Sequence, residues 1–130
     1  MRHAFGTFVL VIVSVFFLFT TWSSGTAPGR FAEQLGLAIA NAGGSNEIRA
    51  QYAGFFLAAA TVCVASLAGA VSRQSAYVVL AVAFGGLIAG RLVSLALNGG
   101  VAGYSSTILA LYAIDAIGFA LAITAMAADR

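Results

Sequence analysis

Four ionisable side chains lie inside or at the edge of strongly apolar stretches of this sequence: Glu47, Arg49, Arg91 and Asp115. A charge at the centre of a bilayer costs on the order of 2.5–3.5 kcal/mol on insertion scales, so such residues usually face the protein interior and have partners. An arginine can extend its charge toward water, but the shorter aspartate cannot. Asp115 therefore needs a partner most, and Arg91 is the expected one.

Polar side chains accompany these charges at helical spacing. Residues three or four positions apart lie on one face of a helix, so Ser94 shares a face with Arg91, and Tyr112 shares one with Asp115. We interpret them as one cluster in the outer half of a helical bundle. This predicted cluster, binding or structural in role, consists of Asn46, Glu47, Arg49, Gln51, Tyr52, Arg91, Ser94, Tyr112 and Asp115.

Two interpretations of the cluster stay open. In the first, it is a buried structural network in which Asp115 pairs with Arg91, with Glu47 as a further member, and it holds the helices in register. In the second, it lines a pocket open to the outer leaflet. That pocket would bind a lipid headgroup, a quinone or another amphiphile, or would relay protons.

Enzyme chemistry has little support in the sequence. The single histidine, His3, is terminal, and the single cysteine, Cys63, lies in an apolar segment without an obvious base. These residues form neither a nucleophile–base pair nor a metal-ligand cluster. We therefore expect no catalytic residue, no metal and no cofactor.

The composition predicts which elements position these charges. The chain has 130 residues, of which 62% are hydrophobic and 8% charged, and its mean hydropathy is +1.02. An average soluble domain is about 45–50% apolar and about 25% charged, so an integral membrane protein is expected. The net charge of +2 comes from scattered arginines, which excludes a nucleic-acid footprint. Arginine without lysine, together with abundant alanine and glycine, favours a bacterial source.

Apolar runs of roughly 20 residues can cross a bilayer as helices, and the sequence contains four. The predicted fold is all-α, a single transmembrane domain built as a four-helix bundle, with a short interfacial helix between helices one and two. A cleavable signal peptide is the alternative for the first run. The predicted spans are 5–24, 48–70, 75–97 and 104–127.

The segment 30–41 between the first two spans places apolar residues on one side and polar residues on the other. This pattern predicts either a short amphipathic helix at the interface or a structured loop. The glycine pair 43–44 should end it, and Ser45 or Asn46 should cap the next helix.

Small residues spaced by four recur in the last three spans, and such spacing lets helix backbones approach closely in a membrane. Aromatic residues near the span ends, Trp22, Tyr52, Tyr77 and Tyr104, are interpreted as interface anchors. The predicted helix-packing glycines are Gly54, Gly86, Gly90 and Gly118.

The arginines near the span ends also predict the orientation. Cytoplasmic loops carry an excess of positive residues, and an inside N-terminus places Arg2, Arg73 and Arg130 together on the cytoplasmic side. We therefore expect a multi-pass protein of the bacterial inner membrane with both termini in the cytoplasm.

The run from Asn46 to Ala58, the run from Ala89 to Leu95 and the acidic residue of the last helix resemble a family of small bacterial membrane proteins, domain of unknown function 4345. The resemblance extends over nearly the full chain. It implies the same four-helix architecture and supplies no activity. Its characteristic positions fall on Asn46, Glu47, Arg49, Tyr52, Gly54, Gly90 and Arg91.

This chain departs from the family pattern at two places. It has Asn98-Gly99-Gly100 where the family has Asp-Gly followed by proline, and it carries Asp115 where glutamate is usual. The negative charge in the last helix is nevertheless kept.

Three functions are carried forward. The leading hypothesis is a binding or accessory component that holds a lipid, a quinone or another amphiphile, alone, as a homo-oligomer or as a subunit of a membrane complex. The alternatives are a small transporter or proton-coupled carrier, and a membrane enzyme that acts on a lipid. In each case the lipid bilayer is an expected partner, and nucleic acid is excluded.

Overall fold

The computed structural model describes residues 2–129, and every regular element in that range is a helix. Four of its segments are long and apolar enough to span a membrane, which confirms the predicted all-α architecture. Three short elements, α3, η1 and α4, run on without a break and form the second of these segments. The elements are α1 (Arg2–Thr26), α2 (Pro28–Gln34), α3 (Ala42–Ile48), the π-helical turn η1 (Arg49–Gly54), α4 (Phe55–Leu67), α5 (Arg73–Asn98) and α6 (Ser106–Ala128).

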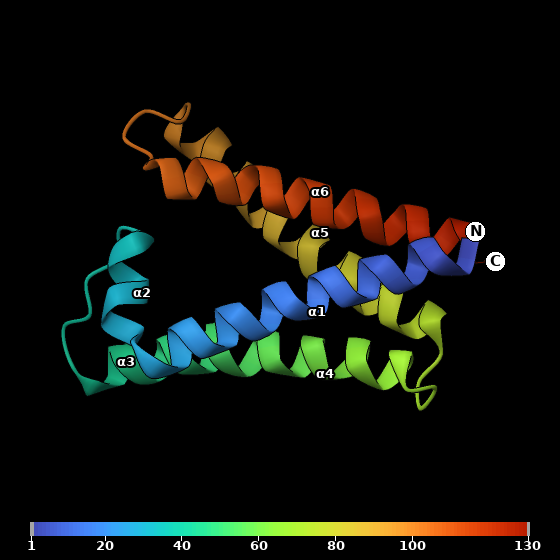
Figure 1. Ribbon diagram of the computed structural model, residues 1–130. Helices are drawn as coiled ribbons and strands as arrows, with labels where there is room; N and C mark the ends of the chain where they lie inside the picture. Colours follow the sequence, from blue (N-terminus) through green and yellow to red (C-terminus); the bar gives the residue numbers. More distant parts are fainter. Residues whose placement is uncertain (1, 130) are drawn as a thin grey trace.

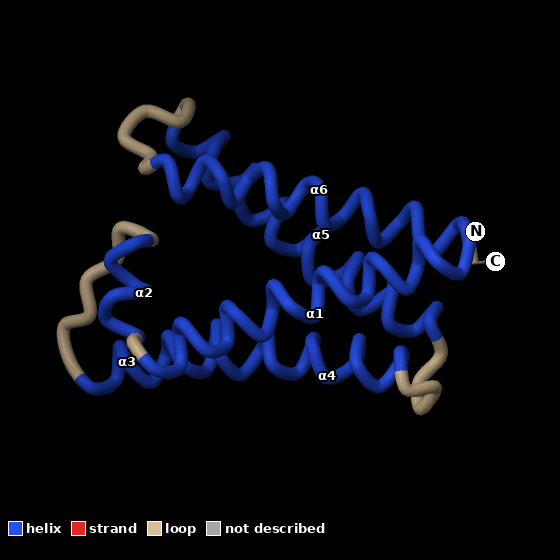
Figure 2. Tube along the Cα trace, in the orientation of Figure 1, coloured by secondary structure: helices blue, strands red, loops and turns tan. Residues whose placement is uncertain are grey.

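The helices form two antiparallel pairs, α1 with α4 and α5 with α6 (Figure 1). The pairs meet at the end that holds both termini, where α1 contacts α6 and α4 contacts α5. They diverge toward the other end, where α2 and the loop between α5 and α6 lie (Figure 2). The bundle is therefore closed at one end and open at the other.

Aromatic side chains fill the centre where the two pairs converge. The Phe17 ring of α1 lies 4.9 Å from the Phe56 ring of α4 and 5.4 Å from the Phe84 ring of α5, measured between centroids. Phe84 in turn packs on Gly118 of α6, where an added Cβ would come within 2.6 Å of the ring. Gly118 is thus a close-packing position, as its sequence context predicts.

The connection between the first two long helices differs from the predicted one. Proline suits the first turn of a helix, so α2 already begins at Pro28, and it ends at Gln34, before Gly36 with φ +76°. The helix therefore does not extend over 30–41. The glycine pair 43–44 lies inside α3, and Asn41 caps that helix by accepting a hydrogen bond from the Gly44 N–H at 3.1 Å, in place of Ser45 or Asn46.

Two of the predicted packing glycines do not pack. A Cβ added at Gly86 or Gly90 would meet no described atom within 4 Å, because α5 has moved away from α4 at that level. A Cβ at Gly54 would meet only the carbonyl oxygen of Arg49, at 3.7 Å in the same helical segment. Instead, Gly6 is tightly enclosed by Tyr77 and Asp129.

Candidate functional site

An ion pair joins α5 and α6 in the open half of the bundle. The Arg91 Nε donates to the Asp115 carboxylate at 2.5 Å, and the Asp115 side chain is only 4% exposed, against 20% for Arg91. Asp115 lies in the middle of α6 and faces α5, as its i−3 and i+3 neighbours Tyr112 and Gly118 do. The charge that the sequence singled out is thus neutralised inside the protein.

Tyr112 holds the arginine from a second side. Its hydroxyl donates to the Arg91 carbonyl oxygen at 2.9 Å, and the Arg91 guanidinium carbon lies 5.4 Å from the centre of the Tyr112 ring. A cation at that distance from an aromatic face is attracted by the negative charge of the ring. These contacts set the direction of the guanidinium.

A second polar group lies one to two turns farther toward the open end. The Tyr104 hydroxyl lies 3.1 Å from the Ser94 hydroxyl and accepts a hydrogen bond from the Asn98 amide at 3.1 Å. These hydrogen bonds, first that of Ser94, lower the pKa of the Tyr104 hydroxyl from its ordinary value. Tyr104 is therefore a member of the site.

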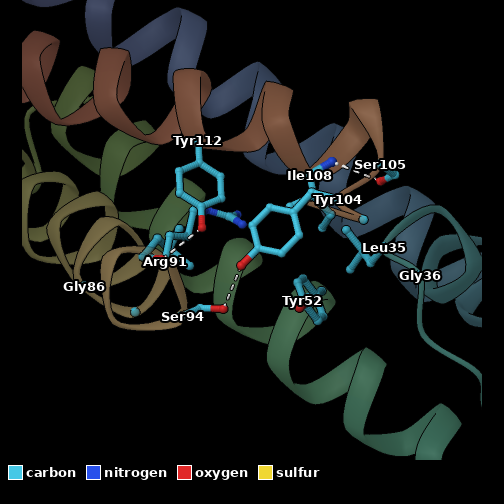
Figure 3. Close-up of a pocket in the computed structure, with 13 residues that line it drawn as sticks. Leu35, Gly36, Tyr52, Gly86, Arg91, Ser94, Tyr104, Ser105, Ile108 and Tyr112 are labelled. Atoms are coloured by element: carbon cyan, nitrogen blue, oxygen red, sulfur yellow. Dashed lines mark hydrogen bonds between the residues drawn. The ribbon is translucent and has the colours of Figure 1, made fainter. Parts of the chain in front are cut away.

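These groups line a cavity of ≈ 590 Å³, which we call the polar cavity (Figure 3). Its walls come from α5, α6 and the loop before α6, and from Tyr52 and the end of α2 on the opposite side. A volume of this size is within the range of small-molecule sites. The lining residues are Leu35, Gly36, Tyr52, Gly86, Leu87, Gly90, Arg91, Ser94, Gly103, Tyr104, Ser105, Ile108 and Tyr112.

Tyr52 connects the polar cavity to the first helix pair. Its ring lies 5.0 Å from the Phe31 ring of α2 and 6.4 Å from the Phe56 ring of α4. Tyr52 belongs to η1, and single π-helical turns inside α-helices occur frequently at functional sites because they redirect side chains. The half-buried Tyr52 thus forms the wall of the cavity that faces Arg91.

A second cavity of ≈ 740 Å³, the apolar groove, runs between the α4 side and α5. It shares Tyr52, Gly86 and Leu87 with the polar cavity, so the two spaces adjoin. Its remaining lining residues are Gln51, Phe55, Phe56, Ala58, Ala59, Val62, Val78, Val79, Val82 and Ala83.

The structure separates the residues that were predicted as one cluster. Arg91, Ser94, Tyr52 and Tyr112 line the polar cavity, and Asp115 lies behind it as the partner of Arg91. Gln51 lines the apolar groove instead.

The three remaining members of the predicted cluster lie elsewhere. Asn46, Glu47 and Arg49 are exposed and line neither cavity, and the Arg49 Nε donates to the Gly25 carbonyl oxygen at 3.1 Å. The helix starts at Ala42 rather than at 48, which adds more than a turn ahead of Glu47. The expected inclusion of Glu47 in the Arg91–Asp115 network is therefore wrong.

Sequence reasoning missed a second polar cluster, at the closed end, which we call the terminal clasp: His3, Thr7, Arg73, Tyr77 and Asp129. The Tyr77 hydroxyl donates to Asp129 at 2.6 Å, and Arg73 donates to Thr7 at 2.9 Å and to the His3 carbonyl oxygen at 3.0 Å. Tyr77 is fully buried and is not an interface anchor. The available signal was Asp129 itself, an acid directly after the last span on the side predicted for Arg73.

Together these observations define a small all-helical protein with four membrane-length helices and a polar cavity at the open end of the bundle. The chain belongs to the family described as domain of unknown function (DUF4345), whose family model matches residues 5–124. Comparison with curated proteins and with solved structures found no match.

Proposed function

We propose that this protein is a multi-pass protein of the bacterial inner membrane that binds an amphiphile in the polar cavity. It would act as a binding or accessory component rather than as an enzyme. The observation that carries the proposal is the ≈ 590 Å³ cavity, which presents Arg91, Ser94 and two tyrosines directly beside an apolar groove. An amphiphile likewise combines a polar headgroup with an apolar chain, so its two parts match the two spaces.

The geometry favours binding over a purely structural role for the cluster. A sealed network would surround Arg91 with close-packed side chains, whereas Gly86 and Gly90 leave open space next to it. Asp115 accepts a hydrogen bond from the arginine Nε, which leaves the two terminal nitrogens of Arg91 without a hydrogen bond to any described residue. A guanidinium carries five N–H donors, so several are free for a ligand.

The proposed orientation places the open end on the outer side of the membrane. Both ends of the described chain lie at the closed end, beside Arg73 (Figure 1). An excess of arginine marks the cytoplasmic side of membrane proteins. The polar cavity then opens toward the outer leaflet, where a lipid-soluble ligand enters from the bilayer.

Replacement of Gly90 by leucine tests the proposal. The new side chain occupies part of the polar cavity, its Cβ meets no described atom within 4 Å, and the change removes no side-chain hydrogen bond. Wild-type protein purified in a mild detergent and extracted with organic solvent should yield a co-purified amphiphile by mass spectrometry. Gly90→Leu should reduce its amount at least ~10-fold.

Ala89→Leu is the matched control, because Ala89 is exposed at nearly the same depth and lines neither cavity. It should retain the wild-type amount. Equal amounts of every co-purified amphiphile in wild type and Gly90→Leu would contradict binding in the polar cavity. The thermal unfolding midpoints of the three proteins show that each is folded.

A further inference from the structure

We propose, on the basis of the proposed function, that the ligand is a single-chain amphiphile with an uncharged, oxygen-bearing headgroup. Its headgroup occupies the polar cavity beside Arg91, and its chain lies in the apolar groove between α4 and α5. Gly86 forms the passage between the two spaces.

Continuity of the two cavities supports one ligand across both. Tyr52, Gly86 and Leu87 line both spaces, with Tyr52 on one side and the α5 residues on the other. Beyond them the groove is lined by phenylalanine, alanine and valine of α4 and by valine and alanine of α5, and Gln51 is the amide among its described lining residues. Polarity therefore falls in one direction, from Arg91 toward Val78.

The length of the groove matches one chain. Val78 and Gly86 are eight residues apart on α5, or roughly 12 Å at 1.5 Å per residue, and Arg91 lies roughly 7 Å farther on. The total of roughly 20 Å compares with roughly 15 Å for one leaflet of a ~30 Å hydrocarbon core. One extended acyl or isoprenoid chain fits this path.

The charge balance of the polar cavity favours an uncharged headgroup. Arg91 is the only charged residue in its lining, and its counter-charge, Asp115, lies directly behind it. An anionic headgroup would add an uncompensated negative charge at this depth in the membrane, which is costly. Hydroxyl and carbonyl oxygens accept hydrogen bonds from an arginine without that cost.

The hydroxyl groups of the wall fit such a headgroup. Ser94 and Tyr104 present hydroxyls to the cavity, in addition to the free N–H groups of Arg91 (Figure 3), whereas the Ser105 hydroxyl caps α6 by accepting from the Ile108 N–H. Hydroxyls both donate and accept hydrogen bonds. Two kinds of single-chain molecule share this chemistry, namely a monoacylglycerol and an isoprenoid quinone.

The test uses a monoacylglycerol that carries a photoreactive diazirine near the end of its acyl chain. The protein is reconstituted in phosphatidylcholine nanodiscs, irradiated and mapped by peptide mass spectrometry. Labels should gather in residues 55–62 of α4 and 78–83 of α5. Labels spread evenly over the outer surface of all four long helices would show ordinary bilayer contact and overturn the proposal.

Gly86→Leu should reduce the labelling of residues 78–83 at least ~10-fold, because the leucine blocks the passage. The substitution replaces a poor helix former by a good one, and its Cβ meets no described atom within 4 Å. Ala89→Leu should leave labelling unchanged. Unchanged labelling in Gly86→Leu would overturn the continuous path.

Unlabelled competitors distinguish the two sources of the headgroup. An excess of unlabelled monoacylglycerol or of an isoprenoid quinone should reduce the labelling of 78–83, and the stronger competitor identifies the ligand. Failure of both to compete would overturn the proposal. Absence of labels on residues 55–62 and 78–83 in a protein that elutes as a dimer would assign the groove to a dimer interface and overturn the proposal as well.

The charge of the headgroup is tested with an alkyl sulfonate of the same chain length and the same diazirine, because a sulfonate stays ionised. Wild type should be labelled at least ~5-fold less by the sulfonate than by the monoacylglycerol. Asp115→Asn leaves Arg91 without its counter-charge and should reverse this preference. Equal labelling of wild type by both probes would overturn the uncharged headgroup.

Failure of this inference is distinguishable from failure of the proposed function. If Gly90→Leu removes the co-purified amphiphile but the tail labels map to α1 and α6, the polar cavity binds a ligand whose chain leaves by another route. If Gly90→Leu changes neither co-purification nor labelling, both proposals fail.

Discussion

The two ends of the bundle each contain an arginine, an aspartate and a tyrosine on α5 and on or directly after α6, yet they differ in their surroundings. At the closed end, Tyr77 and Asp129 are enclosed so tightly that a Cβ on Gly6 would lie 2.5 Å from the Asp129 carboxylate, and Arg73 lies at the edge of this cluster with 32% of its side chain exposed. At the open end, Arg91 and Asp115 lie beside a cavity of ≈ 590 Å³.

This difference shows that residue type alone does not distinguish a tightly packed polar cluster from one that faces a cavity. In the terminal clasp, protein groups fill the positions around the arginine: Thr7 and the His3 carbonyl oxygen accept its hydrogen bonds. In the polar cavity, Arg91 keeps free donors and faces open space. The clasp joins the two helix pairs at the closed end, whereas the cavity lies between them toward the other end.

The largest expected effect is at the open end. Asp115→Ala should lower the free energy of unfolding by about 3 kcal/mol, because it leaves the half-buried Arg91 without its counter-charge. Unfolding in a detergent–urea titration measures this change. Arg91→Ala combined with Asp115→Ala should cost less than the sum of the single changes, by at least about 1 kcal/mol. Additive effects would mean that the pair contributes no coupling.

A glycine from each end gives the next comparison. Gly6→Leu should lower the free energy of unfolding by about 2 kcal/mol, since the new side chain overlaps Tyr77 and Asp129. Gly90→Leu should leave it unchanged or raise it by up to about 0.8 kcal/mol through helix propensity. Both changes are measured by the same titration. A comparable loss in both variants would show that the two ends do not differ in packing.

The tyrosine hydroxyls should show the smallest effects. Tyr77→Phe removes a hydrogen bond to a carboxylate from a fully buried ring and should cost about 1.5 kcal/mol. Tyr104→Phe removes partly exposed hydrogen bonds and should cost about 0.5 kcal/mol. Thermal unfolding of both variants in one detergent provides the comparison. A larger loss of stability for Tyr104→Phe than for Tyr77→Phe would mean that the open end, and not the closed end, contains the stabilising tyrosine hydrogen bonds.

Much of the fold follows from hydropathy alone. The four long helices were predicted, because runs of roughly 20 apolar residues have few alternatives to a membrane-length helix. The pairing of Arg91 with Asp115 was expected for a related reason, since a charge in an apolar segment needs a partner. These inferences use only local composition and the cost of desolvating a charge.

The errors occurred where the contacts come from distant segments. Gly86 and Gly118 have the same small-residue context, but Phe84 packs on Gly118 and no described group packs on Gly86. Tyr77 and Tyr104 both lie near span ends, but only Asp129, far away in the sequence, makes Tyr77 a buried residue. In a membrane, the faces of a helix that contact lipid and protein are equally apolar, so periodicity does not distinguish them.

The sequence by itself therefore determined four apolar helices, their family and the charges that require partners. Only the tertiary structure decided that α5 and α6 converge on α1 and α4 at one end and diverge at the other. The physical reason is that helix formation depends on neighbouring residues, whereas the distance between helices depends on the volumes that meet between them. Large side chains such as Phe17 and Phe84 at the centre, and small ones such as Gly86 and Gly90 beyond it, leave the space beside Arg91.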